Sequence, residues 1–315
     1  MDAYGRRVRY LRISVTDDCN LRCVYCTPQD AVSSKKKLLS KREIVDIAKT
    51  AITLGIEKIR LTGGEPLLRD AILEIAAEIA TLEGLSELCL TTNAILLDRY
   101  ANALKQAGVD RLNISLDSLD PVRYHKLTGG GKLQSVLDGI TAAKNAGFSP
   151  IKINVVLLAG ENEDEICDFI HFGKEYGVDI RFIEQMPIGV SATKANQHFL
   201  PADAVLVACP TLVPVSHPEE DSLERLYQLP DSCHKVGLIA PLSHYFCNSC
   251  NRIRVTADGM LKSCLHSADE ISLVGLSPDA QAAVIRQAVW GKPQGHTMHE
   301  DEVSKSARNM LEIGG

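Results

Sequence analysis

The stretch "SVTDDCNLRCVYC" at residues 14–26 places three cysteines on a short polar segment directly after a β-rich run. Cys19, Cys23 and Cys26 have the spacing C-x3-C-x2-C. Three thiolates on one loop can bind three irons of a cubane cluster and leave the fourth iron open to a non-protein ligand. A zinc site completed by a distant histidine is the alternative, but no histidine precedes His125. We therefore expect an iron–sulfur cluster at the end of the first strand.

Around this loop the chain repeats one unit from residue 9 to about 184, a β-rich run followed by a polar turn and an amphipathic helical run. Strands that alternate with helices predict an α/β fold with a parallel sheet. A doubly wound open sheet and a barrel or partial barrel both fit, and in both the ligands bind at the carboxyl ends of the strands. The expected strands are 10–15, 58–62, 87–92, 111–117, 152–158 and 180–186.

Composition limits the classes of ligand and location. The chain has 315 residues, 45% hydrophobic and 23% charged, which is ordinary for a globular enzyme. Its net charge of −6 gives no overall attraction for nucleic acid, so an anionic ligand needs a local basic site. No segment reaches the roughly 18 apolar residues of a membrane helix, and the N-terminus lacks the apolar core of a signal peptide. We expect a cytoplasmic protein with no membrane or nucleic-acid partner.

A second region follows residues 210–225, where three prolines and an acidic cluster predict a linker. We expect one domain over residues 1–215 and a smaller one over residues 216–315. The second has short β-runs and a helical stretch at 278–291.

The second region carries another group of three cysteines, Cys247, Cys250 and Cys264, in the spacing C-x2-C-x13-C. Turn residues Asp258 and Gly259 predict a hairpin that folds Cys264 back beside the other two. A fourth cysteine is missing downstream, and His266 could complete a zinc site instead.

Between these cysteines lies a strand with two arginines, Arg252 and Arg254, on the face opposite to Ile253 and Val255. Two guanidinium groups beside an open metal suit a phosphorylated ligand. Exposed strand arginines would be the simpler alternative.

The first cysteine loop, with Tyr25 before its last cysteine and "GGEP" at 63–66, resembles that of the radical S-adenosylmethionine (SAM) enzymes over residues 5–190. The resemblance implies a partial (β/α)6 TIM-like barrel in which Cys19, Cys23 and Cys26 hold a [4Fe–4S] cluster. It also implies that S-adenosylmethionine binds the open iron and is cleaved to a 5′-deoxyadenosyl radical. By motif match, the residues that bind S-adenosylmethionine are Tyr25, Gly63, Gly64, Glu65, Ser115 and Met186.

Over nearly its whole length the chain is similar to the GTP 3′,8-cyclase family of molybdenum cofactor biosynthesis, by C-x2-C-x13-C, "NRIR" at 251–254 and the terminal "IGG". This implies a second [4Fe–4S] cluster on Cys247, Cys250 and Cys264 that meets GTP, and conversion of GTP to (8S)-3′,8-cyclo-7,8-dihydroguanosine 5′-triphosphate. The implied GTP-binding residues are Arg12, Arg60, Thr91, Lys152, Arg252, Ile253 and Arg254. The implied catalytic residues are Arg252, Arg254, Gly314 and Gly315.

The resemblance also implies a one-electron donor, a downstream cyclic pyranopterin monophosphate synthase that receives the product, and a homodimer. The basic loop at 27–42 departs from the family, so its contacts stay open. A radical enzyme that matures peptides is one alternative, although such enzymes carry more C-terminal cysteines. A non-catalytic iron–sulfur or zinc scaffold is the other, and it leaves "GGEP" and the two arginines Arg12 and Arg60 unexplained.

Overall fold

The computed structural model describes residues 1–27, 37–193, 198–216, 223–298 and 303–314. Its centre is a curved sheet whose first six strands are parallel and lie side by side in chain order. These are β1 (Tyr10–Ser14), β2 (Lys58–Thr62), β3 (Glu87–Thr92), β4 (Arg111–Ser115), β5 (Ile151–Leu157) and β6 (Asp179–Glu184). The six strands expected from the sequence are therefore confirmed.

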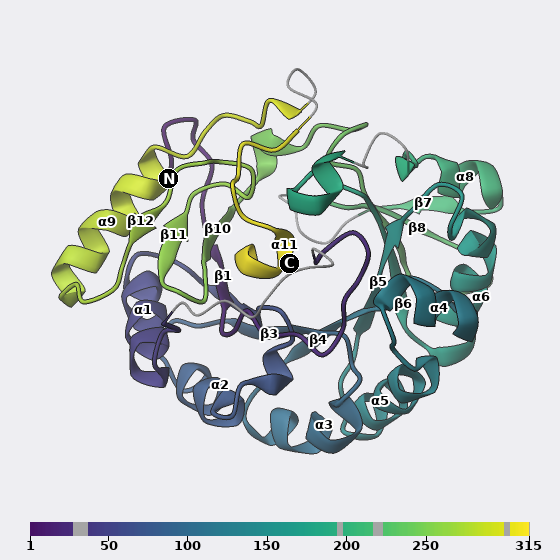
Figure 1. Ribbon diagram of the computed structural model, residues 1–315, viewed down its shortest axis with the longest axis horizontal. Helices are drawn as coiled ribbons and strands as arrows, with labels where there is room; N and C mark the ends of the chain where they lie inside the picture. Colours follow the sequence, from purple (N-terminus) through teal and green to yellow (C-terminus); the bar gives the residue numbers. More distant parts are fainter. Residues whose placement is uncertain (28–36, 194–197, 217–222, 299–302, 315) are drawn as a thin grey trace.

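Helices cover the outer face of this sheet (Figure 1). They are α1 (Lys41–Thr53), α2 (Ile72–Ala80), α3 (Leu97–Gln106), α4 (Pro121–Thr128), α5 (Leu133–Asn145) and α6 (Ile166–Tyr176), with the short helices η1 (Pro66–Leu68), η2 (Glu163–Glu165) and η3 (Gly189–Thr193) in the connecting loops. A doubly wound sheet reverses its strand order and has helices on both faces. The consecutive order and the outer ring of helices instead confirm a partial (β/α)6 barrel.

Later strands extend both edges of the same sheet. At one edge β9 (Val236–Ile239) pairs with β6, followed by β8 (Arg225–Gln228) and β7 (Val213–Val215). At the other edge β10 (Arg252–Val255) pairs parallel with β1, followed by antiparallel β11 (Met260–Lys262) and β12 (Ile271–Ser272). The remaining helices in the described part of the chain are α8 (Ala204–Ala208), η4 (Cys247–Ser249), α9 (Pro278–Trp290) and α11 (Met310–Ile313). The C-terminal third thus adds strands to both sides of the barrel.

The segment at 210–225 differs in part from the predicted linker. Val213–Val215 forms β7, which pairs with β8 at the edge of the sheet. Pro214 is tolerated there because an edge strand needs hydrogen-bond donors on one side only. Residues 217–222, which include the acidic cluster at 219–221, lie outside the described residues.

Residue alternation along the strands separates the core from the barrel interior. Ile13, Ile59 and Ile153 are fully buried in the hydrophobic core that the helices cover. Their neighbours Arg12 and Arg60 line the interior cavity instead. None of the described helices has the length and apolar character needed to cross a membrane.

Candidate active site

The barrel interior holds a cavity of about 870 Å³ whose wall carries both cysteine groups. Such a volume lies in the usual range of ligand sites. The sequence-predicted residues on its wall are Arg12, Cys19, Cys23, Tyr25, Cys26, Arg60, Gly63, Gly64, Thr91, Ser115, Lys152, Met186, Cys247, Cys250, Arg252, Arg254 and Cys264. The fold therefore brings into one cavity residues that lie more than 200 positions apart in the sequence.

The first cysteine loop is fixed by its backbone. Arg22 N donates to Thr128 O at 2.8 Å and Val24 N to Leu127 O at 3.0 Å, which ties the loop to the end of α4. Burial, followed by the neighbouring Cys26 and Asp117, raises the pKa of Cys23 well above its ordinary value, and burial and Cys19 raise the pKa of Cys26 to about 12. Thiolates rather than thiols bind metals, so metal binding at this loop would release these protons.

The two glycines of "GGEP" lie against the first cysteine loop. Gly64 N donates to Thr16 O at 2.9 Å, and Glu65 N donates to Asp18 O at 2.8 Å. A Cβ atom on Gly63 would collide with the Thr16 carbonyl, and one on Gly64 with the Asp18 carbonyl. Glycine is therefore required at both positions for the close approach of two backbones, in addition to any contact with a ligand.

Glu65 differs from the expectation that its carboxylate faces the cavity. The side chain is fully buried, and it accepts hydrogen bonds from Thr92 Oγ1 at 2.8 Å, Asn93 N at 2.7 Å and Leu67 N at 3.0 Å. Burial raises the pKa of Glu65 to about 7. The packing of the loop turns the Glu65 carboxylate away from the cavity. The carboxylate instead links the loop after β2 to the end of β3.

Tyr25 and Asp117 form a pair on the cavity wall. Tyr25 Oη donates to Asp117 Oδ2 at 2.6 Å, and Val156 N donates to Asp117 Oδ1 at 2.8 Å. Burial raises the pKa of Asp117 to about 6. Asp117 lies two residues after the end of β4. The structure gives it a defined task, which is to orient Tyr25 beside the first cysteine loop.

The second cysteine group spans η4 and the β10–β11 hairpin, as the sequence predicts. The two strands are antiparallel with Arg254 opposite Lys262, and Gly259 in the turn has φ +85°. Arg6 Nη1 donates to Cys247 O at 2.7 Å and so fixes the start of η4. Burial alone would raise the pKa of Cys250, but Lys292 and Arg252 outweigh it and lower that pKa.

The two cysteine groups differ from a site for a single metal ion. Over the described part of the chain, no three Cys, His, Asp or Glu side chains converge closely enough to bind one metal ion. Each thiolate of a cubane binds a different iron atom, so a cubane does not need such convergence. Three buried or half-buried cysteines beside an open cavity, in each of the two groups, fit clusters with one open iron.

Arginines from three neighbouring strands form a row in the barrel interior. Arg12 on β1 lies in register with Arg254 on β10 and with Arg60 on β2. Burial and then Arg254 lower the pKa of Arg12, and burial and then Arg252 lower the pKa of Arg254 to about 10. Like charges in register repel, so a bound anion would stabilise this row of arginines.

Tyr10 supports this row and was missed by sequence reasoning. The guanidinium of Arg252 and the ammonium of Lys58 each lie 5.4 Å from the centre of its ring, and Arg60 Nε donates to its hydroxyl. The ring therefore holds three cations in place. Within the described residues, Arg252 Nε is buried without a hydrogen-bond partner, which leaves it available to a ligand.

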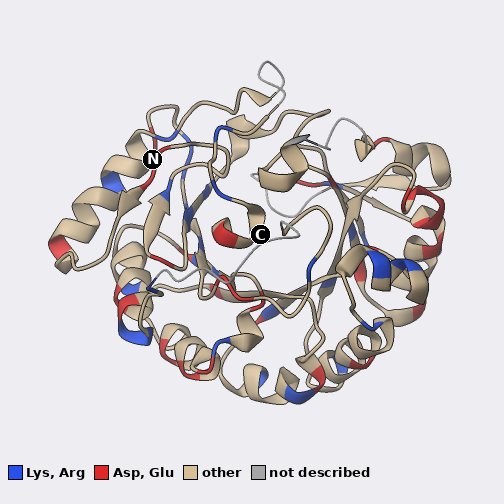
Figure 2. Ribbon diagram, viewed as in Figure 1, with Lys and Arg blue, Asp and Glu red and all other residues tan. Residues whose placement is uncertain are grey.

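The wall of the cavity is more basic than the chain as a whole. It includes eleven lysines and arginines against six acidic residues, although the chain carries −6 overall. Figure 2 shows Lys and Arg positions on the strands around the interior and mixed charges on the outer helices. The cavity therefore attracts anions despite the net charge.

Lys152 is less available than expected. Its Nζ lies 2.8 Å from Glu224 Oε1, and Glu224 also pairs with Arg181 on β6. Arg181 could have been found from the sequence, because a charged residue in an otherwise apolar strand is expected on the face that lines the barrel interior. Glu224 could not, since it lies in the segment predicted as a linker.

Ile253 and Gly314 differ in how they lie relative to the cavity. The side chain of Ile253 lies in the hydrophobic core, because strand alternation turns it away from Arg252 and Arg254, and Ile253 does not line the cavity. Gly314 lies in the barrel, where its carbonyl accepts from Arg254 Nη1 at 2.9 Å. Gly315 and residues 28–36 of the basic loop lie outside the described residues.

Comparisons with known proteins agree with this geometry. Residues 13–173 match the Radical SAM superfamily, and residues 178–298 match Molybdenum Cofactor Synthesis C. A GTP 3′,8-cyclase of Alkaliphilus oremlandii is 44% identical over 319 residues, which cover 100% of this chain and 99% of the relative. A GTP 3′,8-cyclase of Listeria monocytogenes is 42% identical over 328 residues, covering 100% and 98%.

The chain belongs to the GTP 3′,8-cyclase family. This places it among the radical SAM proteins, as the first cysteine loop indicates. Among solved structures, Streptococcus suis SuiB bound to S-adenosylmethionine aligns with a TM-score of 0.63 at 14% identity, covering 89% of this chain and 68% of that chain. At that identity the likeness shows the fold alone, and it confirms the barrel of this family.

Proposed function

We propose that this chain converts GTP to (8S)-3′,8-cyclo-7,8-dihydroguanosine 5′-triphosphate, the first step of molybdenum cofactor biosynthesis. The relatives named GTP 3′,8-cyclase span its full length. The observation that carries the proposal is the row Arg254–Arg12–Arg60, which lies in one cavity with both cysteine groups. A row of buried like charges needs a polyanion, and a triphosphate beside two clusters supplies one.

Residues 1–215 act as the S-adenosylmethionine half of the site in this proposal. Cys19, Cys23 and Cys26 hold the first [4Fe–4S] cluster. When bound, this cluster and S-adenosylmethionine supply the one-electron chemistry that removes hydrogen from C3′ of the ribose. The residues that bind and orient S-adenosylmethionine are Tyr25, Gly63, Gly64, Ser115 and Met186, and Glu65 acts by fixing the "GGEP" loop.

Residues 216–315 act as the GTP half. Cys247, Cys250 and Cys264 hold the second [4Fe–4S] cluster, next to which the guanine binds. The triphosphate binds the guanidinium groups of Arg12, Arg60, Arg252 and Arg254, together with Thr91 and with Lys152 once Lys152 turns from Glu224. These contacts position the bound GTP so that its C3′ and C8 atoms lie close together.

The finer assignments are part of the same proposal. A one-electron donor reduces the first cluster, and a cyclic pyranopterin monophosphate synthase takes the product. The enzyme acts in the cytoplasm as a homodimer. Arg252, Arg254, Gly314 and Gly315 contact the reacting nucleotide.

The test is anaerobic cluster reconstitution followed by incubation with S-adenosylmethionine, reductant and GTP. We expect about eight irons per chain, since each cubane holds four, and formation of 5′-deoxyadenosine and the cyclised nucleotide that depends on GTP. Zinc in the second site, or 5′-deoxyadenosine formation indifferent to GTP, would contradict the proposal.

A further inference from the structure

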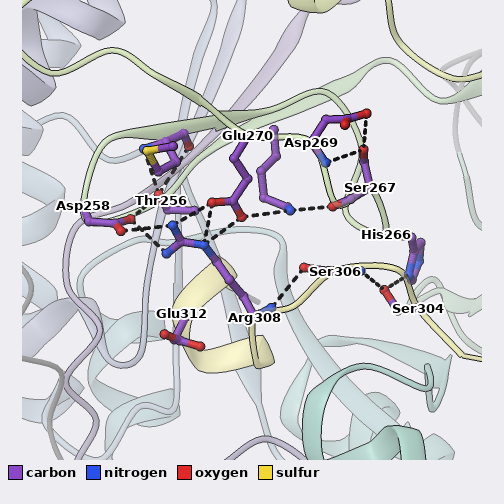
Figure 3. Close-up of polar contacts among 12 residues, drawn as sticks. Thr256, Asp258, His266, Ser267, Asp269, Glu270, Ser304, Ser306, Arg308 and Glu312 are labelled. Atoms are coloured by element: carbon purple, nitrogen blue, oxygen red, sulfur yellow. Dashed lines mark hydrogen bonds and ion pairs between the residues drawn. The ribbon is translucent and has the colours of Figure 1, made fainter.

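The chain after residue 303 returns to the barrel and is held there by Arg308 (Figure 3). Arg308 Nε donates to both carboxylate oxygens of Glu270, at 2.7 and 2.9 Å. Its Nη1 and Nη2 donate to the two oxygens of Asp258, at 2.9 and 3.0 Å. The Arg308 side chain is only 12% exposed. Two forked ion pairs on one guanidinium are strong and directional.

Both acceptors belong to the antiparallel unit β10–β11–β12, which extends the β10–β11 hairpin with the basic strand. Asp258 lies in the turn between β10 and β11, and Glu270 directly precedes β12. Glu270 also lies 3.1 Å from Nζ of Lys262, a fully buried lysine of β11 that donates to Ser267 O at 2.7 Å. The Glu270 carboxylate is therefore also held by Lys262, a contact that does not involve Arg308.

On the other side of Arg308 the tail enters the cavity. Asn309 and Glu312 cap the short helix α11 reciprocally, and a Cβ atom on Gly189 would collide with Asn309. Leu311 lines the cavity and lies directly beside Gly64 of the first half of the site. The tail thus extends from the hairpin of the second cysteine group to the loops of the first.

At its end the tail meets the arginine row. The Gly314 carbonyl accepts from Arg254 Nη1 at 2.9 Å. A Cβ atom on Gly314 would lie 2.9 Å from Ser14 Cβ and 3.1 Å from Thr62 Cγ2, at the carboxyl ends of β1 and β2. Gly314 has φ +83°, so the narrow space and the backbone conformation both require glycine.

We propose that Arg308 is a positioning residue, which clasps the hairpin through Asp258 and Glu270 and so places Gly314 against Arg254 in the active site. A helix of four residues is too short to be stable alone, so α11 depends on such an anchor. The catalytic consequence rests on the proposed function, whereas the anchoring rests on the contacts alone.

The test compares Arg308→Ala and Arg308→Lys with Arg123→Ala and Arg123→Lys in the reconstituted enzyme. Arg123 is a matched control, because it makes a similar fork with Asp164, at 2.6 and 2.9 Å, far along the chain from the hairpin. Hydrogen exchange is measured at the amides of Glu312, Ile313 and Gly314, which donate to carbonyls of Asn309 and Met310. Steady-state kinetics with GTP are measured in parallel.

We expect both Arg308 variants to reduce protection of the tail amides by roughly tenfold or more, the factor for loss of charged hydrogen bonds. The Leu273 amide, which follows β12 and donates to Gly259 O in the hairpin turn at 2.9 Å, keeps its protection in Arg308→Lys. The value of kcat with GTP falls by a similar factor, while KM for S-adenosylmethionine stays as in the parent. The Arg123 variants change neither tail exchange nor kcat.

Unchanged tail exchange in both Arg308 variants would overturn the clasp. A loosened tail with unchanged kcat would overturn its positioning role. If Arg308→Ala also loosens the hairpin, Arg308→Lys decides, because lysine keeps the charge and loses the fork. Should the parent make no product from GTP, the proposed function fails, and the exchange experiment still tests the clasp by itself.

Discussion

The two cysteine groups differ more in their surroundings than in their ligands. In the first group, burial, neighbouring thiols and Asp117 raise the pKa of Cys23. In the second group, Lys292 and Arg252 lower the pKa of Cys250 against the effect of burial. An acidic neighbourhood suits a sulfonium ligand, and a basic one suits a triphosphate. The two groups therefore have the same thiolate ligands but different surroundings, with an acidic neighbour at the first and basic neighbours at the second.

The two groups also differ in how the chain builds them. The first lies within eight residues of one loop, tied to the end of α4. The second is assembled from η4 and a hairpin, with Arg6 and the C-terminal tail holding them from outside. The first site is therefore a local structure, and the second depends on contacts across the whole chain.

The largest effect is expected from removing one group at a time. Cys23→Ala with Cys26→Ala, or Cys250→Ala with Cys264→Ala, should each lower the iron content by about four per chain. The first pair abolishes 5′-deoxyadenosine formation entirely. The second abolishes the cyclised nucleotide but leaves slow cleavage of S-adenosylmethionine. Iron assays measure the cluster content, and chromatography of the nucleosides measures the two products. Identical losses of both products in the two double variants would contradict separate roles for the two cysteine groups.

The next largest effect is expected at Arg252, beside the second cysteine group. Arg252→Ala should weaken GTP binding by roughly a hundredfold, because it removes a buried charge pair worth about 3 kcal/mol. Binding of S-adenosylmethionine should not change. Equilibrium binding of both ligands measures this, with Arg123→Ala as the control. Equal losses for both ligands would mean that the two halves of the site are not separate.

Glu224 balances positive charge in the cavity when GTP is absent. Burial alone would raise its pKa, but Arg181 and Lys152 outweigh it and hold the pKa well below the usual 4.5. The ionised carboxylate therefore stabilises the fold above pH 4.5, and this stabilisation is lost progressively as pH falls below 4.5.

Glu224→Gln should accordingly lower the free energy of unfolding of the cluster-free chain by about 2 kcal/mol at neutral pH. The difference in free energy of unfolding between parent and variant should narrow at about pH 3, because the ionised carboxylate of the parent stabilises the fold less at that pH. Urea unfolding at the two pH values measures it. A gap that is the same at both would show that Glu224 does not act through its charge.

The smallest effect is a gain of stability. Arg252 lowers the pKa of Arg12 and of Arg254 and shares the Tyr10 ring with Lys58. Arg252→Met should therefore raise the free energy of unfolding of the cluster-free chain by about 1 kcal/mol, by removing a half-buried charge from like neighbours. Thermal unfolding without GTP measures it. A loss of stability would mean that the contact with the Tyr10 ring outweighs the repulsion.

Local pattern made much of this molecule predictable. Strand periodicity predicted β1 to β6, because apolar residues such as Ile13 and Ile59 must face the helices. The spacing of the first cysteines and the turn at Gly259 were likewise readable, since each depends on a few neighbouring residues.

Contacts between distant segments were not predictable in the same way. The attachment of β9 and β10 to opposite edges of the barrel depends on tertiary pairing that no local pattern carries. Glu65 was expected to face a ligand, yet burial and three donors turn its carboxylate to the protein. Arg308 gave no signal, because a charged residue near a chain end ordinarily lies in solvent.

The central claim is that the second open iron, in its basic surroundings, receives GTP. The direct test is an electron paramagnetic resonance spectrum of the second cluster in Cys23→Ala with Cys26→Ala, recorded with and without each ligand. The account predicts that GTP changes the spectrum and that S-adenosylmethionine does not. A spectrum that GTP leaves unchanged, or that S-adenosylmethionine changes instead, would contradict it.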